Sequence, residues 1–369
     1  MRMLLTGQIG LDKRQYLAEF EALAKARGEA VKVFHVGDMM YREAPDVKPG
    51  RILDLPLSRL GSLRRAVFRD ILREAPKHKN VIVNSHATFR WKHGLFAAFD
   101  FDQLRELQAD LYVTLLDNVE SIHQRLLLEH GTDHTLKDLM VWREEEILAT
   151  EILARANAAH PGQFYVLARG RRQPTVDAVF GLLLRPGMRK VYPSFPMSHV
   201  MDLPAILAEI DAFRQALRSH FITFDPGDVD EKALHDRAVE IARNGETCIT
   251  TPAGGTTVRL NVSDILAIGP DIDGQIYARD FMMVRQSDFI VSYIPELPGG
   301  KPGLSSGVER ELQHAYDHAR EAYVIWRPKA NPSPFITQTA TAVFRDVPTA
   351  LKHFEEKGYL TPHDLFGGA

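Results

Sequence analysis

Short apolar runs alternate with longer amphipathic stretches along the first half of the chain. The apolar runs are RMLLTG, EAVKVFHV, NVIVNSH, ADLYVTLLD and QFYVLARG, and each has the length and residue types of a buried strand. Between them lie stretches such as DKRQYLAEFEALAKAR and LGSLRRAVFRDILREA, whose apolar positions recur with helical spacing. This alternation predicts a parallel sheet with helices on both faces.

A break at residues 182–195, LLLRPGMRKVYPSF, interrupts the pattern with Pro186 and Gly187. The alternation then restarts with the strand-like runs RKVYPSF, FITFDP, DFIVSYI and AYVIWRP. The helical patterns PAILAEIDAFRQALRSH, EKALHDRAVEIARN and SGVERELQHAYDHAR lie between them. We therefore expect the α/β class with two doubly wound parallel-sheet domains, over residues 1–187 and 188–369.

The composition is that of ordinary globular domains, with 45% hydrophobic and 25% charged residues. A net charge of -3 gives no overall basic field, so we expect no nucleic-acid partner. The single cysteine, Cys248, excludes an internal disulfide and suits a reducing compartment. The first apolar run is too short for a signal peptide and no stretch has the length of a membrane span, so the sequence predicts a cytoplasmic protein with no membrane contact.

The segment MLLTGQIGLDKRQYL places a glycine turn, with Gly7 and Gly10, between the first predicted strand and the first predicted helix. A phosphate-binding P-loop has a glycine, four residues, a second glycine, a lysine, and then Ser or Thr. Gly7 and Lys13 match this spacing, but Asp12 takes the place of the second glycine and Arg14 that of the magnesium-binding hydroxyl. A carboxylate opposes phosphate binding there, and a guanidinium cannot bind a cation.

Three further segments give residues 1 to about 170 a resemblance to archaeal-type adenylate kinases. VKVFHVGDMMYREA resembles the strand and loop of their nucleoside-monophosphate site. VIVNSHATFRWKHG resembles the strand that carries a Thr/Ser-His pair and a downstream Arg, and ADLYVTLLDNVESIHQRLL the strand and Arg-bearing helix before their lid. The resemblance implies a P-loop kinase-like domain with ATP and Mg²⁺ as its ligands. The residues it would place at the nucleotide are Gly7, Gly10, Lys13, Asp38, His86, Arg90 and, near the lid, Arg125.

The segment at 277–315, YARDFMMVRQSDFIVSYIPELPGGKPGLSSGVERELQHA, has an acid in a predicted helix, then an apolar strand and a glycine-rich loop. Gly307, Glu311 and Ala315 follow at intervals of four, and the helix acid is Asp280. The pattern resembles the nucleoside 2-deoxyribosyltransferases and their relatives that hydrolyse the N-glycosidic bond of nucleoside 5'-monophosphates, over about residues 188–330. Ser305 matches the serine with which those hydrolases hold the 5'-phosphate, and KVYPSFPMSHV resembles the opening strand and loop of this Rossmann-like fold.

This second resemblance implies cleavage of an N-glycosidic bond, by water or by base exchange. Cleavage builds positive charge on the anomeric carbon, which a carboxylate beneath it stabilises or attacks. Glu311 would be that nucleophile and Asp280 the assisting acid, whereas Glu309 points about 200° around the helix from Glu311 and would only oppose the helix dipole. The expected substrate contacts are Ser305, Ser306, Gly307, Tyr192, Ser194 and Ser198.

Two alternatives to the glycosidase stay open: an active nucleotide kinase with an accessory C-terminal domain, and a non-catalytic nucleotide sensor. Because the metal and phosphate positions of the P-loop are both altered, we expect binding with lost or altered phosphoryl transfer. A small nucleotide is the partner in every case, and the resemblance to the transferases implies a homo-oligomer. We expect no cofactor for glycosidic cleavage and no metal site, since His130 and His134 lack the third ligand that zinc requires.

Overall fold

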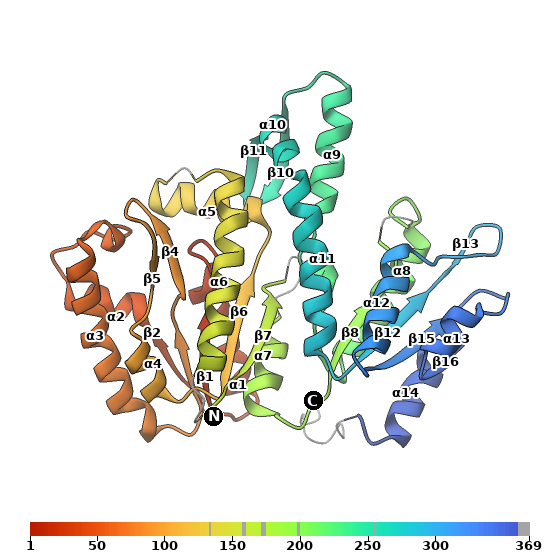
Figure 1. Ribbon diagram of the computed structural model, residues 1–369, viewed down its shortest axis with the longest axis horizontal. Helices are drawn as coiled ribbons and strands as arrows, with labels where there is room; N and C mark the ends of the chain where they lie inside the picture. The colour runs from red at the N-terminus through yellow and green to blue at the C-terminus, as the bar shows by residue number, and fades with distance from the viewer. Residues whose placement is uncertain (133, 157–159, 171–174, 198–199, 254–255, 361–369) are drawn as a thin grey trace. The chain divides into compact units, whose positions relative to one another are not determined.

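The computed structural model describes residues 1–132, 134–156, 160–170, 175–197, 200–253 and 256–360. The chain forms two compact units (Figure 1). The first unit comprises residues 1–184 and 228–275, and the second comprises residues 185–227 and the chain from residue 276 onward. Each unit contains a five-stranded parallel sheet covered by helices, which confirms the predicted α/β class.

The sheet of the first unit has the strand order β2-β3-β1-β6-β7, and all neighbours run parallel. Its central strands are almost wholly apolar because helices cover both faces. The five strands are β1 (Arg2–Thr6), β2 (Lys32–His35), β3 (Val81–Asn84), β6 (Leu111–Leu116) and β7 (Gln163–Ala168).

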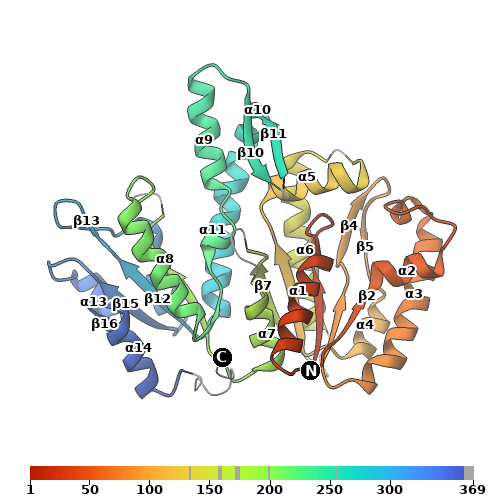
Figure 2. The same ribbon diagram turned by 180° about the vertical axis from the view of Figure 1, so that it is seen from behind.

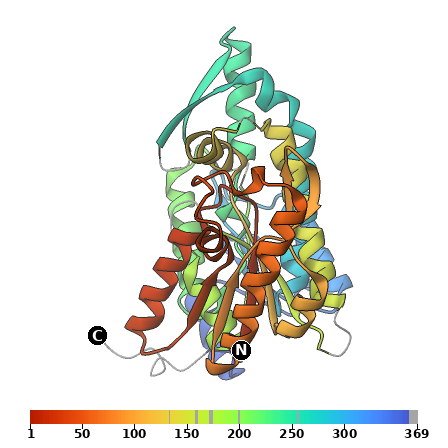
Figure 3. The same ribbon diagram turned by 90° about the vertical axis from the view of Figure 1, so that its left-hand side faces the viewer.

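Helices α1 (Lys13–Ala26) and α7 (Val176–Leu184) cover one face of this sheet, and α6 (Leu136–Ala156) covers the other (Figure 2). The edge view in Figure 3 shows the same sheet between α1 in red and α6 in yellow. The buried positions of α1, such as Tyr16, Leu17 and Phe20, follow the predicted helical spacing. The unit also contains α2 (Val36–Glu43), α3 (Leu57–Glu74), α4 (Phe101–Leu107), α5 (Val119–His130) and the hairpin of β4 (Thr88–Trp91) and β5 (Gly94–Ala97).

Residues 228–275 belong to the first unit, which differs from the continuous second domain expected over 188–369. Glu231, immediately before the first of their helices, accepts hydrogen bonds from both terminal nitrogens of Arg143. Such a buried pair between distant residues leaves no local pattern in the sequence. The segment contains α9 (Lys232–Arg243), the hairpin β10 (Cys248–Ala253) and β11 (Thr256–Asn261), α10 (Val262–Ala267) and the start of α11 (Gly269–Gln286).

The sheet of the second unit has the order β16-β15-β12-β8-β9 and is also parallel throughout. Its strands are β8 (Lys190–Ser194), β9 (Ile222–Thr223), β12 (Phe289–Ile294), β15 (Glu321–Trp326) and β16 (Ala342–Phe344). A core rich in aromatic rings, among them Phe213, Phe289 and Phe354, packs on this sheet. The remaining elements are α8 (Pro204–Arg218), α12 (Ser306–Asp317), α13 (Pro334–Thr339), α14 (Val347–Glu356) and the short pair β13 (Glu296–Leu297) and β14 (Lys301–Pro302).

The helices within the described residues include none that is both long and apolar enough to cross a membrane.

Candidate functional site

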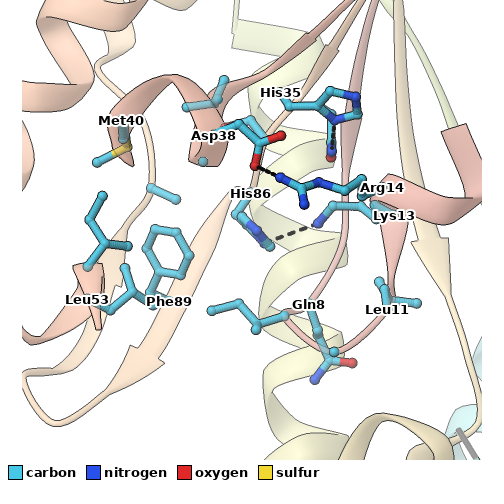
Figure 4. Close-up of a pocket in the computed structure, with 18 of the residues that line it drawn as sticks. Gln8, Leu11, Lys13, Arg14, His35, Asp38, Met40, Leu53, His86 and Phe89 are labelled. Carbon is cyan, nitrogen blue, oxygen red and sulfur yellow. Dashed lines mark hydrogen bonds and ion pairs between the residues drawn. The ribbon is translucent and has the colours of Figure 1, made fainter. Parts of the chain in front are cut away.

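A cavity of about 490 Å³ lies in the first unit where β1, β2 and β3 end (Figure 4). Open parallel sheets place ligands at this edge because the loops that follow the strands converge there. The volume suits a small organic ligand. The apolar residues that line the cavity include Met40, Leu53, Phe89 and Trp91, and the polar ones include Lys13, Arg14, Asp38, Arg64 and His86.

The glycine turn before α1 keeps a tight backbone conformation in spite of Asp12. Gly7 has φ 132°, and Asp12 has φ 52° in the left-handed region, which Asp can adopt because its side chain hydrogen-bonds locally. Asp12 caps α1 by accepting a bond from the backbone N–H of Gln15 at 3.4 Å, and it also faces Arg169 at 3.4 Å. The helix end that would receive a phosphate in a P-loop therefore already holds a carboxylate.

Lys13 is buried beside His86, and both line the cavity. Its Nζ donates to the carbonyl oxygen of Gly7 at 2.5 Å and lies 3.2 Å from Nδ1 of His86. Burial lowers the pKa of Lys13 to about 7, although the charge of Glu146 opposes the shift. Burial, and then the charge of Lys13, also lower the pKa of His86 well below its ordinary value. The charge of the cavity lining therefore changes near neutral pH.

Arg64 of α3 also lines the cavity, and only 6% of it is exposed. Its Nη1 donates to the carbonyl oxygen of Ala97 at 3.3 Å, while Nε and Nη2 are buried with no hydrogen-bond partner among the described residues. Burial lowers the pKa of Arg64 to about 10. A buried cation with unsatisfied donors is costly, and the guanidinium of Arg64 also lies over the ring of Phe89, 5.8 Å from its centre.

Sequence reasoning overlooked Arg64, although the sequence carries a signal for it. The buried face of α3 consists of Leu60, Arg64, Val67, Phe68 and Ile71. Arg64 is thus the one charged residue on an otherwise apolar helical face.

Arg14 and Asp38 form an ion pair, and Figure 4 shows their side chains pointing toward each other. Both residues line the cavity. Their side chains are 69% and 39% exposed, so water screens the pair and its contribution to stability is small. Four of the residues predicted at the nucleotide, Gly10, Lys13, Asp38 and His86, line this cavity, and their contact with a nucleotide stays a prediction.

The structure places Arg90, Arg125 and Gly7 in other roles. Arg90 donates two hydrogen bonds to Glu145, both at 2.6 Å. Arg125 bonds to Asp117 at 2.7 Å and to the carbonyl oxygen of Gly10 at 2.9 Å, so it holds the glycine turn. None of the three is among the residues that line the cavity.

A second cluster of polar groups surrounds Glu311 in the second unit. One oxygen of Glu311 accepts a hydrogen bond from the hydroxyl of Tyr192 at 2.7 Å, and the other accepts one from Ser194 at 2.5 Å. Tyr192 and Ser194 are two residues apart on β8, so both side chains lie on the same face of the strand. Glu311 lies in the second turn of α12, and the two bonds fix the orientation of its carboxyl group.

The pKa values of two carboxyl groups in this cluster, Glu311 and Asp280, are raised. Burial raises the pKa of Glu311 to about 8, and the nearby charge of Asp280 adds to the shift while the bonds from Ser194 and Tyr192 oppose it. Burial raises the pKa of Asp280 to about 6, against the attraction of Arg279, whose Nε lies 3.4 Å from Oδ1 of Asp280. Glu311 therefore keeps its proton to a higher pH than Asp280 does.

The start of α12 is built as the sequence predicts. Ser305 is the N-cap, and its hydroxyl accepts a bond from the backbone N–H of Val308 at 3.3 Å. Ser306 and Gly307 follow and are exposed, and Glu309 is exposed as well. Ser198, expected to contact substrate, lies outside the described residues.

A family model described as an AAA domain matches residues 20–143. The matched residues lie within the first unit. The match includes Arg64 and His86 and begins after the glycine turn. The comparison with curated proteins finds no match.

Three solved structures show distant similarity to the chain. A gluconokinase from Sinorhizobium meliloti is 16% identical, with 47% of this chain and 83% of that chain covered and a TM-score of 0.28. A structure of the PezAT toxin–antitoxin system of Streptococcus pneumoniae is 8% identical, with 50% of this chain and 78% of that chain covered and a TM-score of 0.30. A phosphoglycerate kinase from Coxiella burnetii is 11% identical, with 97% of this chain and 94% of that chain covered and a TM-score of 0.18. None of these similarities tells us what this chain binds, and none concerns a deoxyribosyltransferase, so that resemblance stays a prediction.

Proposed function

We propose that the first unit binds a nucleotide in its cavity. The observation that carries this proposal is Arg64, a buried residue that lines the cavity, whose guanidinium lies over the ring of Phe89 and has two nitrogens with no hydrogen-bond partner among the described residues. A guanidinium is planar and presents paired donors, which suits the oxygens of a phosphate or carboxylate. An anion that satisfied those donors would gain a charge-assisted bond.

The rest of the wall supports a nucleotide over a simple anion. Lys13 offers a second cation among the lining residues. Phe89, Trp91 and Met40 offer apolar and aromatic surface of the kind on which a base packs. The match of residues 20–143 to an AAA domain supports the same conclusion.

Nucleotide binding is required both of a nucleotide kinase and of a nucleotide sensor, the two functions that the cavity could serve. Lys13 occupies the lysine position of a P-loop, which supports a nucleotide kinase. Asp12 at the helix end and Arg14 at the hydroxyl position support a binding module, because they alter the phosphate and metal roles that phosphoryl transfer requires. Formation of ADP from ATP that is lost in Lys13→Met identifies a kinase, and binding without turnover identifies a sensor.

Isothermal titration calorimetry with nucleoside mono-, di- and triphosphates tests the binding itself. We expect phosphorylated nucleosides to bind and Arg64→Ala to weaken them about 30-fold, the effect of losing about 2 kcal/mol from a buried charge pair. Arg65→Ala is the matched control, because Arg65 is the next residue of α3 and is exposed. Absence of binding, or equal affinity in wild type and Arg64→Ala, would refute the proposal.

A second function, cleavage of an N-glycosidic bond in a nucleoside monophosphate, is favoured by the geometry around Glu311. Each of its oxygens accepts one hydroxyl bond, which orients the carboxyl group and opposes part of the rise in its pKa. The nucleophile would be the ionised form of Glu311, whose pKa is about 8, so base release should increase as the pH rises toward that value, with Asp280 as the assisting residue. Chromatographic detection of free base from a panel of nucleoside and deoxynucleoside monophosphates tests this function.

We expect base release to disappear in Glu311→Gln and to persist in Glu309→Gln. The two substitutions make the same chemical change two residues apart on α12, but Glu309 is exposed and outside the cluster. Release that survives in Glu311→Gln, or no release by wild type, would exclude this second function and leave the nucleotide-binding proposal standing.

A further inference from the structure

A P-loop normally holds its nucleotide together with Mg²⁺. The Ser or Thr after the lysine binds the cation, which neutralises phosphate charge. In this chain Arg14 stands at that position, and its guanidinium pairs with Asp38 in the cavity wall (Figure 4). A guanidinium has donors only, so it cannot bind a cation and would repel one.

The carboxylates near the glycine turn are also engaged elsewhere, whereas Mg²⁺ binds octahedrally through one or two carboxylates, phosphate oxygens and water. Asp12 caps α1 and faces Arg169, and Asp117 is paired with Arg125. Glu146 accepts hydrogen bonds from the backbone N–H groups of Gly7, Ala87 and Thr88. Throughout the ranges that the structure describes, no three His, Cys, Asp or Glu side chains gather as a metal site. The residues present therefore do not fit the metal that a P-loop implies.

We propose that the cavity binds its nucleotide without a divalent cation, and that Arg14 supplies the positive charge which Mg²⁺ supplies elsewhere. This inference rests on the nucleotide-binding proposal and specifies the form of the ligand. Because the Arg14–Asp38 pair is exposed and weak, a phosphate can replace Asp38 as the partner of Arg14 at little cost. Lys13, in its protonated form, and Arg14 and Arg64 then provide three positive charges around the cavity for an uncomplexed phosphate.

The charges of Lys13, Arg14 and Arg64 indicate which class of nucleotide the cavity suits. These three side chains can balance the charge of a nucleoside monophosphate without a metal ion. A triphosphate in cells travels as its magnesium complex, and Arg14 opposes the cation of that complex by like-charge repulsion. The cavity is thus suited to a metal-free nucleoside monophosphate over a magnesium triphosphate.

Titration calorimetry on the full chain with AMP and with ATP, each in EDTA and in excess Mg²⁺ at equal ionic strength, tests the inference. We expect the affinity for AMP to be the same in both buffers, and the affinity for ATP to fall when Mg²⁺ is added. Arg14→Ser restores the P-loop hydroxyl, and we expect it to weaken binding in EDTA about tenfold, the loss of one charged hydrogen bond. Arg14→Lys, which keeps the charge, should retain most of the metal-free affinity.

Arg42→Ser is the control, since Arg42 is exposed on α2 and does not line the cavity. It should bind as wild type does in both buffers. Binding that appears only with Mg²⁺, or metal-free binding that Arg14→Ser leaves unchanged, overturns this inference alone. Binding in neither buffer overturns the proposed function as well, so the two failures are distinguishable.

Discussion

Arg143 of α6 and Glu231 form a bidentate ion pair, with nitrogen–oxygen distances of 2.8 and 2.9 Å. Both side chains are buried, at 3% and 0% exposure. Glu231 also accepts a bond from the backbone N–H of Val119, the first residue of α5. One carboxylate therefore joins residues 228–275 to two helices of the first unit.

Glu231→Ala should destabilise the first unit strongly, because it leaves the Arg143 guanidinium buried without its carboxylate. We expect a loss of about 3 to 5 kcal/mol in the free energy of unfolding, measured by urea denaturation. Asp236→Ala is the control, since it removes an exposed pair with Lys232 on the neighbouring α9 and should cost less than about 1 kcal/mol. A similar small cost for both variants would show that the buried pair does not hold this segment.

Nucleotide affinity should fall as the pH rises above about 7. The pKa of Lys13 is about 7 in the free protein, so this side chain loses its charge as the pH rises through that value and attracts an anion less. Calorimetry from pH 6 to 9 in buffers of different ionisation enthalpy should also detect proton uptake on binding. In Lys13→Met, the part of the pH dependence of nucleotide affinity that comes from this side chain should be absent. Lys25 is exposed in the last turn of α1, so Lys25→Met should keep the pH dependence of the wild type. If Lys13→Met took up as many protons on binding as wild type does, Lys13 would not be the group that is protonated.

Glu311 should make the second unit less stable at alkaline pH. Its pKa of about 8 is raised from an ordinary value of 4.5, so the folded protein binds a proton more tightly than the unfolded chain does. The contribution of this proton to the free energy of unfolding is fully present below about pH 4.5 and is lost as the pH rises through 8. Thermal unfolding from pH 5 to 9 should show Glu311→Gln less sensitive to pH than wild type, with a difference of about 1 to 3 kcal/mol across this range. Glu309→Gln should behave as wild type, and matching pH profiles for all three proteins would disprove the shift.

Gly7→Ala should destabilise the first unit more than Gly28→Ala. Both glycines have positive φ, at 132° and 72°, so both substitutions strain the backbone. A Cβ at Gly7 would also lie 2.4 Å from Cδ1 of Leu11 and 2.7 Å from the carbonyl oxygen of Leu115, whereas nothing lies within 4 Å at Gly28. We expect a cost of about 1 to 2 kcal/mol at Gly28 and about 1 to 3 kcal/mol more at Gly7, from chemical denaturation. Equal costs would mean that the turn moves to accept the methyl group.

The sequence alone determined the local elements, because strands and helices depend on the spacing of neighbouring residues. The apolar runs became the parallel strands, and the spacing of Tyr16, Leu17 and Phe20 produced α1. The helical pattern that begins at Ser306 became α12. The glycine turn and the changes at Asp12 and Arg14 were also readable from the sequence.

Only the tertiary structure decided what these residues contact, because burial and charge pairing join positions far apart in the chain. Arg90 pairs with Glu145 and does not line the cavity, whereas Arg64 lines it with two nitrogens that have no hydrogen-bond partner among the described residues. The same long-range contacts set the pKa of Lys13 and aligned β8 with Glu311. Residues 228–275 joined the first unit through a buried ion pair that no neighbouring residues could signal.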